Sequence, residues 1–254
     1  MTSPDSPTDV TAPTEGQAST GAVTVAIDGP SGSGKSSVSK AAAQRLGLAY
    51  LDTGAMYRAA TWWCLDQAVD LTDADAVAAA VRAMPLVMGV DPAAPTVHVG
   101  ETDVAGPIRT TEISTAVSAV ATNLAVRDEL RRLQRAEIDA QRDPSSLSQG
   151  RGMVAEGRDI TTVVAPDADA RILLTASEES RLARRARELH GDADAASVAA
   201  TRDQVVRRDA DDSTVSQFTV AADGVVTVDS SDLDLEQTVD AVLAVIAQVT
   251  GTHE

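Results

Sequence analysis

Val23-Thr-Val-Ala-Ile-Asp-Gly-Pro-Ser-Gly-Ser-Gly-Lys-Ser-Ser37 joins an apolar run to the pattern Gly29-x-x-x-x-Gly34-Lys35-Ser36. Glycines allow successive backbone N–H groups to point at one centre, and the N-terminus of a following helix adds positive potential. In such a loop the lysine reaches the terminal phosphates of a nucleotide, and the serine is placed to ligate magnesium. The segment therefore predicts a strand, a phosphate-binding loop and a helix.

From residue 21 onward, strand-like and helix-like segments alternate, which is the pattern of a parallel sheet covered by helices in an α/β fold. Between Pro85 and Gly106 the pattern changes to short β-like pieces, so we expect a small insertion outside the main sheet. The expected strands are Val23–Ile27, Leu48–Leu51, Leu86–Val90, Thr96–Val99, Met153–Glu156, Arg171–Leu174 and Val225–Val228. The expected helices are Ser36–Leu46, Ala55–Gln67, Asp73–Arg82, Thr111–Val120, Val126–Gln141, Glu178–His190, Ala195–Arg208 and Leu235–Val249.

Composition limits the class of protein and its partners. The 254 residues are 43% hydrophobic, which is enough to bury one sizeable core, and no apolar run approaches membrane-spanning length. A net charge of −17 argues against nucleic acid or an anionic membrane as a partner, because most of the surface would repel them. We expect a cytoplasmic enzyme that meets any anionic substrate with local clusters of arginine.

The ends of the chain and its few sulfur and imidazole groups add further expectations. Residues 1–20 are rich in Ser, Thr, Pro and Asp, which predicts a disordered tail and neither a secretory signal nor a transit peptide. The single cysteine, Cys64, cannot form an internal disulfide and is expected in the core. The three histidines show no ligand spacing, so no zinc site is expected.

Three further clusters could bind anions at the carboxyl ends of strands. They are Leu51-Asp-Thr-Gly-Ala-Met-Tyr-Arg58, Glu156-Gly-Arg-Asp-Ile160, and the arginine-dense segment with Arg181, Arg184, Arg185, Arg187, Arg207 and Arg208. Taken singly, each is also consistent with an ordinary solvated helix face or a surface ion pair. Together with the phosphate-binding loop they favour a site for phosphorylated substrates.

With Ile108-Arg109 added, these motifs resemble bacterial cytidylate kinases, P-loop nucleoside monophosphate kinases, in order and spacing over roughly Val23 to Val249. The resemblance implies transfer of the γ-phosphoryl group of ATP to CMP or dCMP, with Mg²⁺ accompanying ATP. It also implies a monomer with a three-layer P-loop core, a monophosphate-binding insertion at about residues 67–110 and a helical lid at about residues 184–215, within one kinase domain over residues 21–254.

The resemblance assigns roles to individual residues. ATP would be bound by Gly29, Pro30, Ser31, Gly32, Ser33, Gly34, Lys35, Ser36 and Ser37, with Ser36 on Mg²⁺ and Glu156 near the water shell of the metal. The catalytic charges would be Lys35, Arg158, Arg181, Arg184 and Arg185. CMP would be bound by Thr53, Arg58, Arg109, Ser118, Arg127, Arg158, Asp159, Arg208 and Asp212. Within that set, Arg58 and Arg158 would hold the phosphate, Ser118, Arg127 and Asp159 would face cytosine, and Arg208 and Asp212 would read the ribose.

Two positions depart from the family pattern. An arginine commonly follows Asp-Ser-Thr, whereas Val215 stands here, and Arg207 is the nearest candidate to replace it. The family tends to have glycine where this chain has Thr161, which could change how closely the backbone approaches the substrate.

Two alternatives remain open at this stage. One is a P-loop kinase acting on the hydroxyl of a sugar acid or a shikimate-like compound, which would need a general base and fewer arginines. The other is a nucleotide-binding module without turnover, for which Val215 is the main argument.

Overall fold

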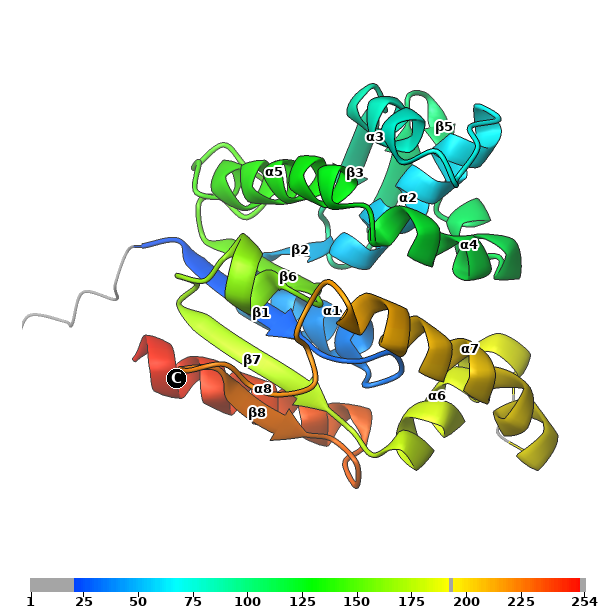
Figure 1. Ribbon diagram of the computed structural model, residues 1–254. Helices are drawn as coiled ribbons and strands as arrows, with labels where there is room; N and C mark the ends of the chain where they lie inside the picture. The colour runs from blue at the N-terminus through cyan, green and yellow to red at the C-terminus, as the bar shows by residue number, and fades with distance from the viewer. Residues whose placement is uncertain (1–20, 192–193, 252–254) are drawn as a thin grey trace, which may run out of the picture.

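A five-stranded parallel sheet forms the centre of the structure (Figure 1). The computed structural model describes residues 21–191 and 194–251. The sheet order is β2-β6-β1-β7-β8, and the strands are β1 (Val23–Asp28), β2 (Ala49–Asp52), β6 (Gly152–Gly157), β7 (Ala170–Thr175) and β8 (Val226–Asp229). Because every pair is parallel, the carboxyl ends of the strands and the loops that follow them meet at one edge.

Helices cover both faces of this sheet, because successive strand residues point to opposite faces. On one face, Val25 and Ile27 pack with α1 (Lys35–Leu46) and α8 (Leu235–Thr250). On the other, Ala26 packs with Ile160 and with α5 (Leu124–Ala140). Burial on both faces explains why most residues of β1 are apolar, and the predicted three-layer α/β fold is confirmed.

A second, antiparallel sheet lies outside the central one (Figure 1) and contains β3 (Leu86–Gly89), β4 (Thr96–Val99) and β5 (Thr102–Asp103). It shares a separate apolar cluster with α5 and with α2 (Thr53–Asp66), α3 (Ala74–Arg82) and α4 (Thr111–Ala121). Cys64 is fully buried in this cluster, as predicted.

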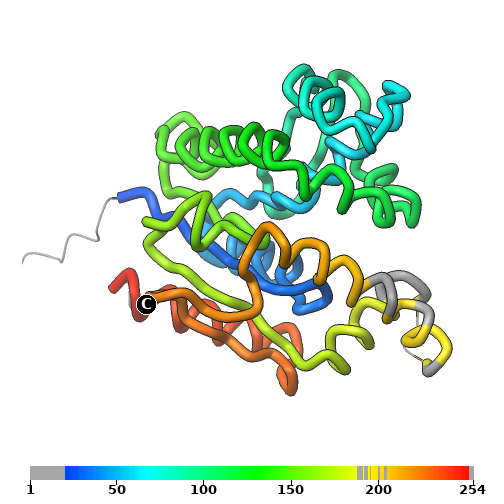
Figure 2. Tube along the Cα trace, in the orientation of Figure 1, coloured from blue at the N-terminus to red at the C-terminus, as the bar shows by residue number. Residues whose placement is uncertain are grey.

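Two helices, α6 (Glu178–His190) and α7 (Ala195–Ser213), lie side by side beyond the carboxyl edge of β7 (Figures 1 and 2). Ser177 caps α6 by accepting from the N–H of Ser180, and Asp194 caps α7 by accepting from that of Ser197. The antiparallel sheet and the helices α2, α3, α4 and α5 together form a second lobe, and α7 contacts its helix α4. The helix pair therefore connects the edge of the central sheet to the second lobe.

All predicted helices and strands are present, with small differences at their ends. The prediction did not include β5, the 3-10 turn η1 (Pro107–Arg109) or the π-helical turn η2 (Ile160–Val164). The turn η2 depends on a distant partner, because the N–H groups of Ile160 and Thr161 donate to the carboxylate of Asp28. The predicted disordered tail lies outside the described residues. Within the described part of the chain, no helix combines the length and the apolar character needed to cross a bilayer.

Candidate active site

The glycine-rich loop follows β1 and enters α1 at Gly34, which has a φ of 93°. Gly32 has a φ of 77°, and a Cβ on it would lie 2.5 Å from the backbone oxygen of Arg181. Glycine fits both positions because it has no Cβ and adopts positive φ at no steric cost. The loop is therefore bent in front of a helix N-terminus, as phosphate binding requires.

Lys35 begins α1 and folds its side chain over the loop, so that Nζ donates to the carbonyl oxygen of Pro30 at 2.8 Å. An ammonium group has three donors, and this bond uses one of them. Burial lowers the pKa of Lys35, and the carboxylate of Glu156 opposes the shift. Lys35 thus carries a poorly solvated charge over the loop, where a phosphate oxygen would be its natural partner.

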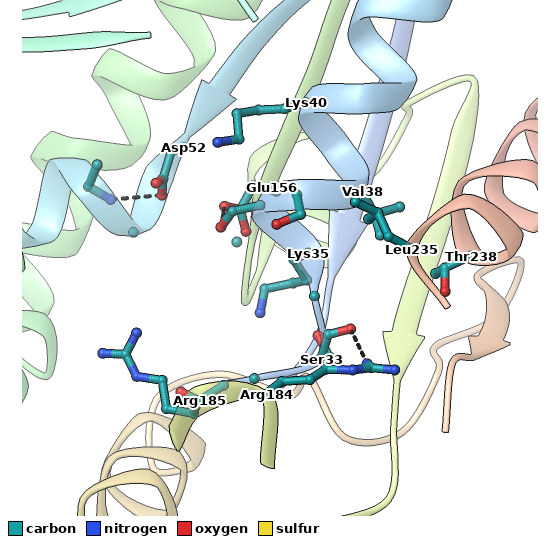
Figure 3. Close-up of a pocket in the computed structure, with 18 of the residues that line it drawn as sticks. Ser33, Lys35, Val38, Lys40, Asp52, Glu156, Arg184, Arg185, Leu235 and Thr238 are labelled. Atoms are coloured by element: carbon teal, nitrogen blue, oxygen red, sulfur yellow. Dashed lines mark hydrogen bonds between the residues drawn. The ribbon is translucent and has the colours of Figure 1, made fainter. Parts of the chain in front are cut away.

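A cavity of about 1180 Å³ lies beside the loop and takes its lining from the core, the second lobe and α6 and α7 (Figure 3). The predicted site residues that line it are Ser31, Gly32, Ser33, Gly34, Lys35, Ser36, Ser37, Arg58, Arg109, Glu156, Arg158, Arg184, Arg185 and Arg208. The predicted residues outside the lining are Gly29, Pro30, Thr53, Ser118, Arg127, Asp159, Arg181 and Asp212.

Positive charge is concentrated in this cavity although the chain as a whole is strongly acidic. Burial and the neighbouring charges of Arg58 and Arg158 lower the pKa of Arg208 to about 9. The Nε of Arg208 is buried without a hydrogen-bond partner among the described residues and lies 3.8 Å from Asp212 Oδ2. Arginines that raise each other's electrostatic energy in this way form a strong site for an anion.

Asp209 on α7 binds both Arg158 and Arg181, which the sequence analysis placed in the catalytic set. Its Oδ1 accepts from Arg158 Nη1 at 2.8 Å and from the N–H of Ser31 at 3.1 Å, and its Oδ2 accepts from Arg181 at 2.5 Å. Burial acts to raise the pKa of Asp209, but Arg158 and these hydrogen bonds outweigh it and lower the pKa. Asp209, which the sequence analysis did not single out, thus links α7 to the loop, to β6 and to α6.

Arg158 and Arg181 differ in their relation to the cavity. Arg158 lines it, pairs with Asp212 Oδ2 at 2.9 Å and stacks on the ring of Phe218 at 4.4 Å. Arg181 lies outside the lining and donates to the backbone oxygen of Ser31 at 2.9 Å. Arg181 therefore supports the loop through the carbonyl group of Ser31, and its catalytic role stays a prediction.

Arg184 also supports the loop. It donates to the backbone oxygen of Ser33 at 3.2 Å (Figure 3), and to the backbone oxygens of Ser230 and Leu233 after β8 at 2.6 Å and 3.2 Å. Burial lowers the pKa of Arg184, and the charge of Arg187 adds to this. Arg185 lines the cavity and extends below Lys35 in Figure 3, and Arg187 of the same helix also lines the cavity.

Glu156 is the next-to-last residue of β6, lines the cavity and is 3% exposed. Its Oε1 accepts from Ser36 Oγ at 2.6 Å and from Tyr50 Oη at 3.2 Å. Burial raises the pKa of Glu156, and the charge of Asp52 adds to this while Lys35 opposes it. The hydroxyl of Ser36 and two carboxylates thus meet beside Lys35, and hard oxygen ligands of this kind suit Mg²⁺.

Two of the residues predicted to face cytosine, Arg127 and Asp159, lie outside the cavity lining and form a buried ion pair that Arg131 joins. Asp159 Oδ2 accepts from Arg127 Nη2 at 2.7 Å and from Arg131 Nε and Nη2 at 3.0 Å and 2.7 Å. Arg127 also donates to the backbone oxygen of Ala121 on α4 and lies 5.6 Å from the ring of Tyr57. Ser118 precedes Ala121 on the same helix by three residues and is half-buried. Sequence reasoning missed Arg131, although its spacing of four residues from Arg127 places both on one face of a helix.

The two departures from the family pattern have different outcomes. Thr161 is buried, and its N–H and hydroxyl both donate to Asp28 Oδ2, at 2.8 Å and 2.7 Å, so its side chain fixes the end of β1. Thr53 has a comparable supporting role, because its hydroxyl donates to the backbone oxygen of Glu156. Arg207 is exposed and lies outside the cavity lining, so its replacement of the arginine missing at Val215 stays a prediction.

Comparisons with known proteins agree with this geometry. The family model for cytidylate kinase matches residues 25–248. A cytidylate kinase from Streptomyces avermitilis is 49% identical over 228 residues, which cover 89% of this chain and 94% of that protein. A cytidylate kinase from Nocardia farcinica is 48% identical, covering 90% of this chain and 95% of its own, and one from Rhodococcus jostii is 44% identical, covering 93% and 100%. The chain therefore belongs to the cytidylate kinase family.

Proposed function

We propose that this protein transfers the γ-phosphoryl group of ATP to the phosphate of CMP or dCMP, giving ADP and CDP or dCDP. The observation that carries the proposal is the cavity in which the glycine-rich loop and Lys35 face a group of arginines from the second lobe and from α7. Two phosphorylated substrates fit this arrangement, one on each side. The family to which the chain belongs supports the same reaction.

The reaction requires the protein to align the two substrates and to neutralise the charge of their phosphates. It requires no strong base, because the attacking oxygen already belongs to an anionic phosphate. Lys35 and the loop would hold the β- and γ-phosphates, and Arg185 and Arg158 would neutralise the transferring group from the opposite side. A kinase acting on a hydroxyl would instead need a base and fewer acceptor-side arginines, so the gathered arginines favour a phosphate acceptor.

On the acceptor side, Arg58 and Arg158 would grip the CMP phosphate, with Arg109 nearby. Arg208 and Asp212 would read the ribose, and Asp159 and Arg127 would read the cytosine. The lobe around the second sheet would be the monophosphate-binding insertion, and α6 and α7 would be the lid. We expect the base to reach Asp159 and Arg127 when α7 moves relative to α4, since neither residue lines the cavity now.

A divalent metal belongs to this reaction, and we propose Mg²⁺ bound with ATP. Ser36 would ligate it, and Glu156 would hold its water shell, since the two side chains already meet at 2.6 Å beside Lys35. When bound, the ion would neutralise charge on the ATP phosphates.

Glu156→Gln is expected to raise the Mg²⁺ concentration for half-maximal activity by about tenfold. Since the pKa of Glu156 is raised, its carboxyl takes up a proton as pH falls through the neutral range and then holds a hydrated cation less well. The wild-type Mg²⁺ requirement should therefore rise as pH is lowered from about 8 to about 6, while that of the variant stays flat. Magnesium titrations of activity across this pH range measure both effects, and parallel pH curves for the two proteins would contradict the role.

Arg58→Ala is expected to raise KM for CMP, dCMP and UMP alike by about 10-fold to 100-fold, because a charged hydrogen bond to the shared phosphate is lost. Arg58 is held toward the cavity by Ser114 Oγ at 2.8 Å, so its guanidinium is already positioned. KM for ATP should stay unchanged. Arg82→Ala, on an exposed arginine of α3, is the matched control and should change neither constant.

The proposal is tested by measuring ADP formation from ATP and Mg²⁺ with CMP, dCMP, UMP and AMP supplied separately, alongside shikimate and gluconate. Turnover with the cytidine nucleotides well above the rest is the expected result, and it would show that Val215 does not prevent catalysis. Turnover with shikimate or gluconate alone would overturn the proposal. ATP binding without turnover of any acceptor would instead identify a nucleotide-binding module.

A further inference from the structure

Two arginines bind one oxygen of Asp159. A single carboxylate carries one negative charge, so one arginine would be enough to balance it. Arg127 and Arg131 both donate to Oδ2, and Arg131 does so with Nε and Nη2 together. The Asp159 and Arg127 side chains are 5% and 4% exposed, and that of Arg131 is 17% exposed. Among the described residues, the one other ion pair of Arg131 is a long contact to the exposed Asp128, at 3.7 Å. Its main partner is therefore the buried carboxylate.

The other oxygen of Asp159 differs from Oδ2. Among the described residues, no hydrogen bond reaches Oδ1, and Oδ1 is not one of the buried atoms without a partner. Arg127 belongs to the same cluster, and its Nε is buried without a hydrogen-bond partner among the described residues. The cluster thus leaves one carboxylate acceptor and one guanidinium donor unused.

This pair of groups matches the pairing edge of one pyrimidine. Cytosine offers an amine that donates and a ring nitrogen that accepts, whereas uracil reverses both. A carboxylate reads the amine only when it is ionised and when the reading oxygen has no competing donor. Arg131 meets the second condition, because it binds Asp159 through Oδ2 alone and leaves Oδ1 without a competing donor.

Resting on the proposed function, we propose that Arg131 is a positioning residue that sets the preference for cytosine over uracil by directing Asp159 Oδ1 at the base. Arg131 acts through Asp159 and does not touch the substrate. A purely structural ion pair between α5 and the segment after β6 would instead affect folding or the use of every monophosphate equally.

The test compares kcat/KM for CMP and for UMP in the full-length wild-type protein and in Arg131→Gln, with ATP saturating. The CMP-to-UMP ratio should fall by roughly tenfold in the variant, through a higher KM for CMP, with kcat and KM for ATP unchanged. Arg131→Lys keeps the charge but loses the two-donor fork, so its ratio should lie between the two. Arg132→Gln is the matched control, since Arg132 is the next residue on α5 but pairs with Glu129 at 64% exposure. Its ratio should equal that of the wild type.

Melting temperatures show whether each variant is folded. If Arg131→Gln does not fold, the CMP-to-UMP ratio of Arg131→Lys is compared with that of the wild type. Equal losses on CMP and UMP, or an unchanged ratio in a folded Arg131 variant, would overturn the inference. Either result leaves the proposed function intact as long as the wild type prefers CMP. A wild type that does not phosphorylate CMP would instead overturn the proposed function itself.

Discussion

Replacing Lys35 by methionine is expected to lower kcat by about 10²-fold to 10³-fold, with KM for CMP little changed. The reason is that Lys35 supplies a fixed positive charge at the loop, where negative charge gathers during phosphoryl transfer. Methionine retains much of the length and packs easily, so the loop should keep its shape. Steady-state kinetics with ATP and CMP varied in turn measure the effect.

Stability separates this catalytic loss from misfolding. The pKa of Lys35 is lowered in the folded protein, so the charged lysine costs stability at pH values below that pKa. Lys35→Met should therefore melt at or above the wild-type temperature while losing activity. Arg45→Met is the control on the same helix, because Arg45 pairs with Glu236 and Asp240 on the surface. A Lys35→Met protein that keeps kcat within about tenfold of the wild type would refute the assigned role.

The central sheet could be predicted from sequence because its determinants are local. The apolar run of β1, the glycines of the loop and the alternation of strands with helices each act over a few residues. The same holds for helix ends, such as Asp52 accepting from the N–H of Ala55 at the start of α2.

The parts that sequence did not reveal depend on contacts between distant segments. Asp209 accepts a hydrogen bond from the N–H of Ser31, which is 178 residues away in the sequence. The sequence around Asp209 therefore gives no sign that this carboxylate binds the glycine-rich loop. From the sequence, Thr161 is only a polar residue near the site. Its role in fixing the end of β1 is seen in its hydrogen bond to Asp28, which is 133 residues away. Arg131 is different, because its helical spacing from Arg127 could have been read from the sequence. That both arginines bind Asp159 still required the fold.

Arg158→Gln is expected to reduce both activity and stability. Arg158 joins Asp209, Asp212 and Ser31 at 2.6 Å to 2.9 Å, and all of these groups except Ser31 are carboxylates with little solvent access. Removing it leaves two carboxylates to face each other with less compensation, at a cost of about 3 kcal/mol in the free energy of unfolding. It also removes positive charge from the cavity, so kcat for CMP should fall by about 10²-fold or more.

The double variant Arg158→Gln/Asp212→Asn separates these two effects. Neutralising Asp212 removes most of the repulsion that the single variant creates, so the free energy of unfolding should recover by roughly half or more of the loss. The value of kcat should not recover, since neither substitution restores the positive charge that Arg158 places next to the substrate phosphate. Chemical denaturation and kcat, measured on the wild type, both single variants and the double variant, complete the cycle. Recovery of kcat together with stability would mean that Arg158 acts by holding α7 in place, and that it does not contact the substrate phosphates.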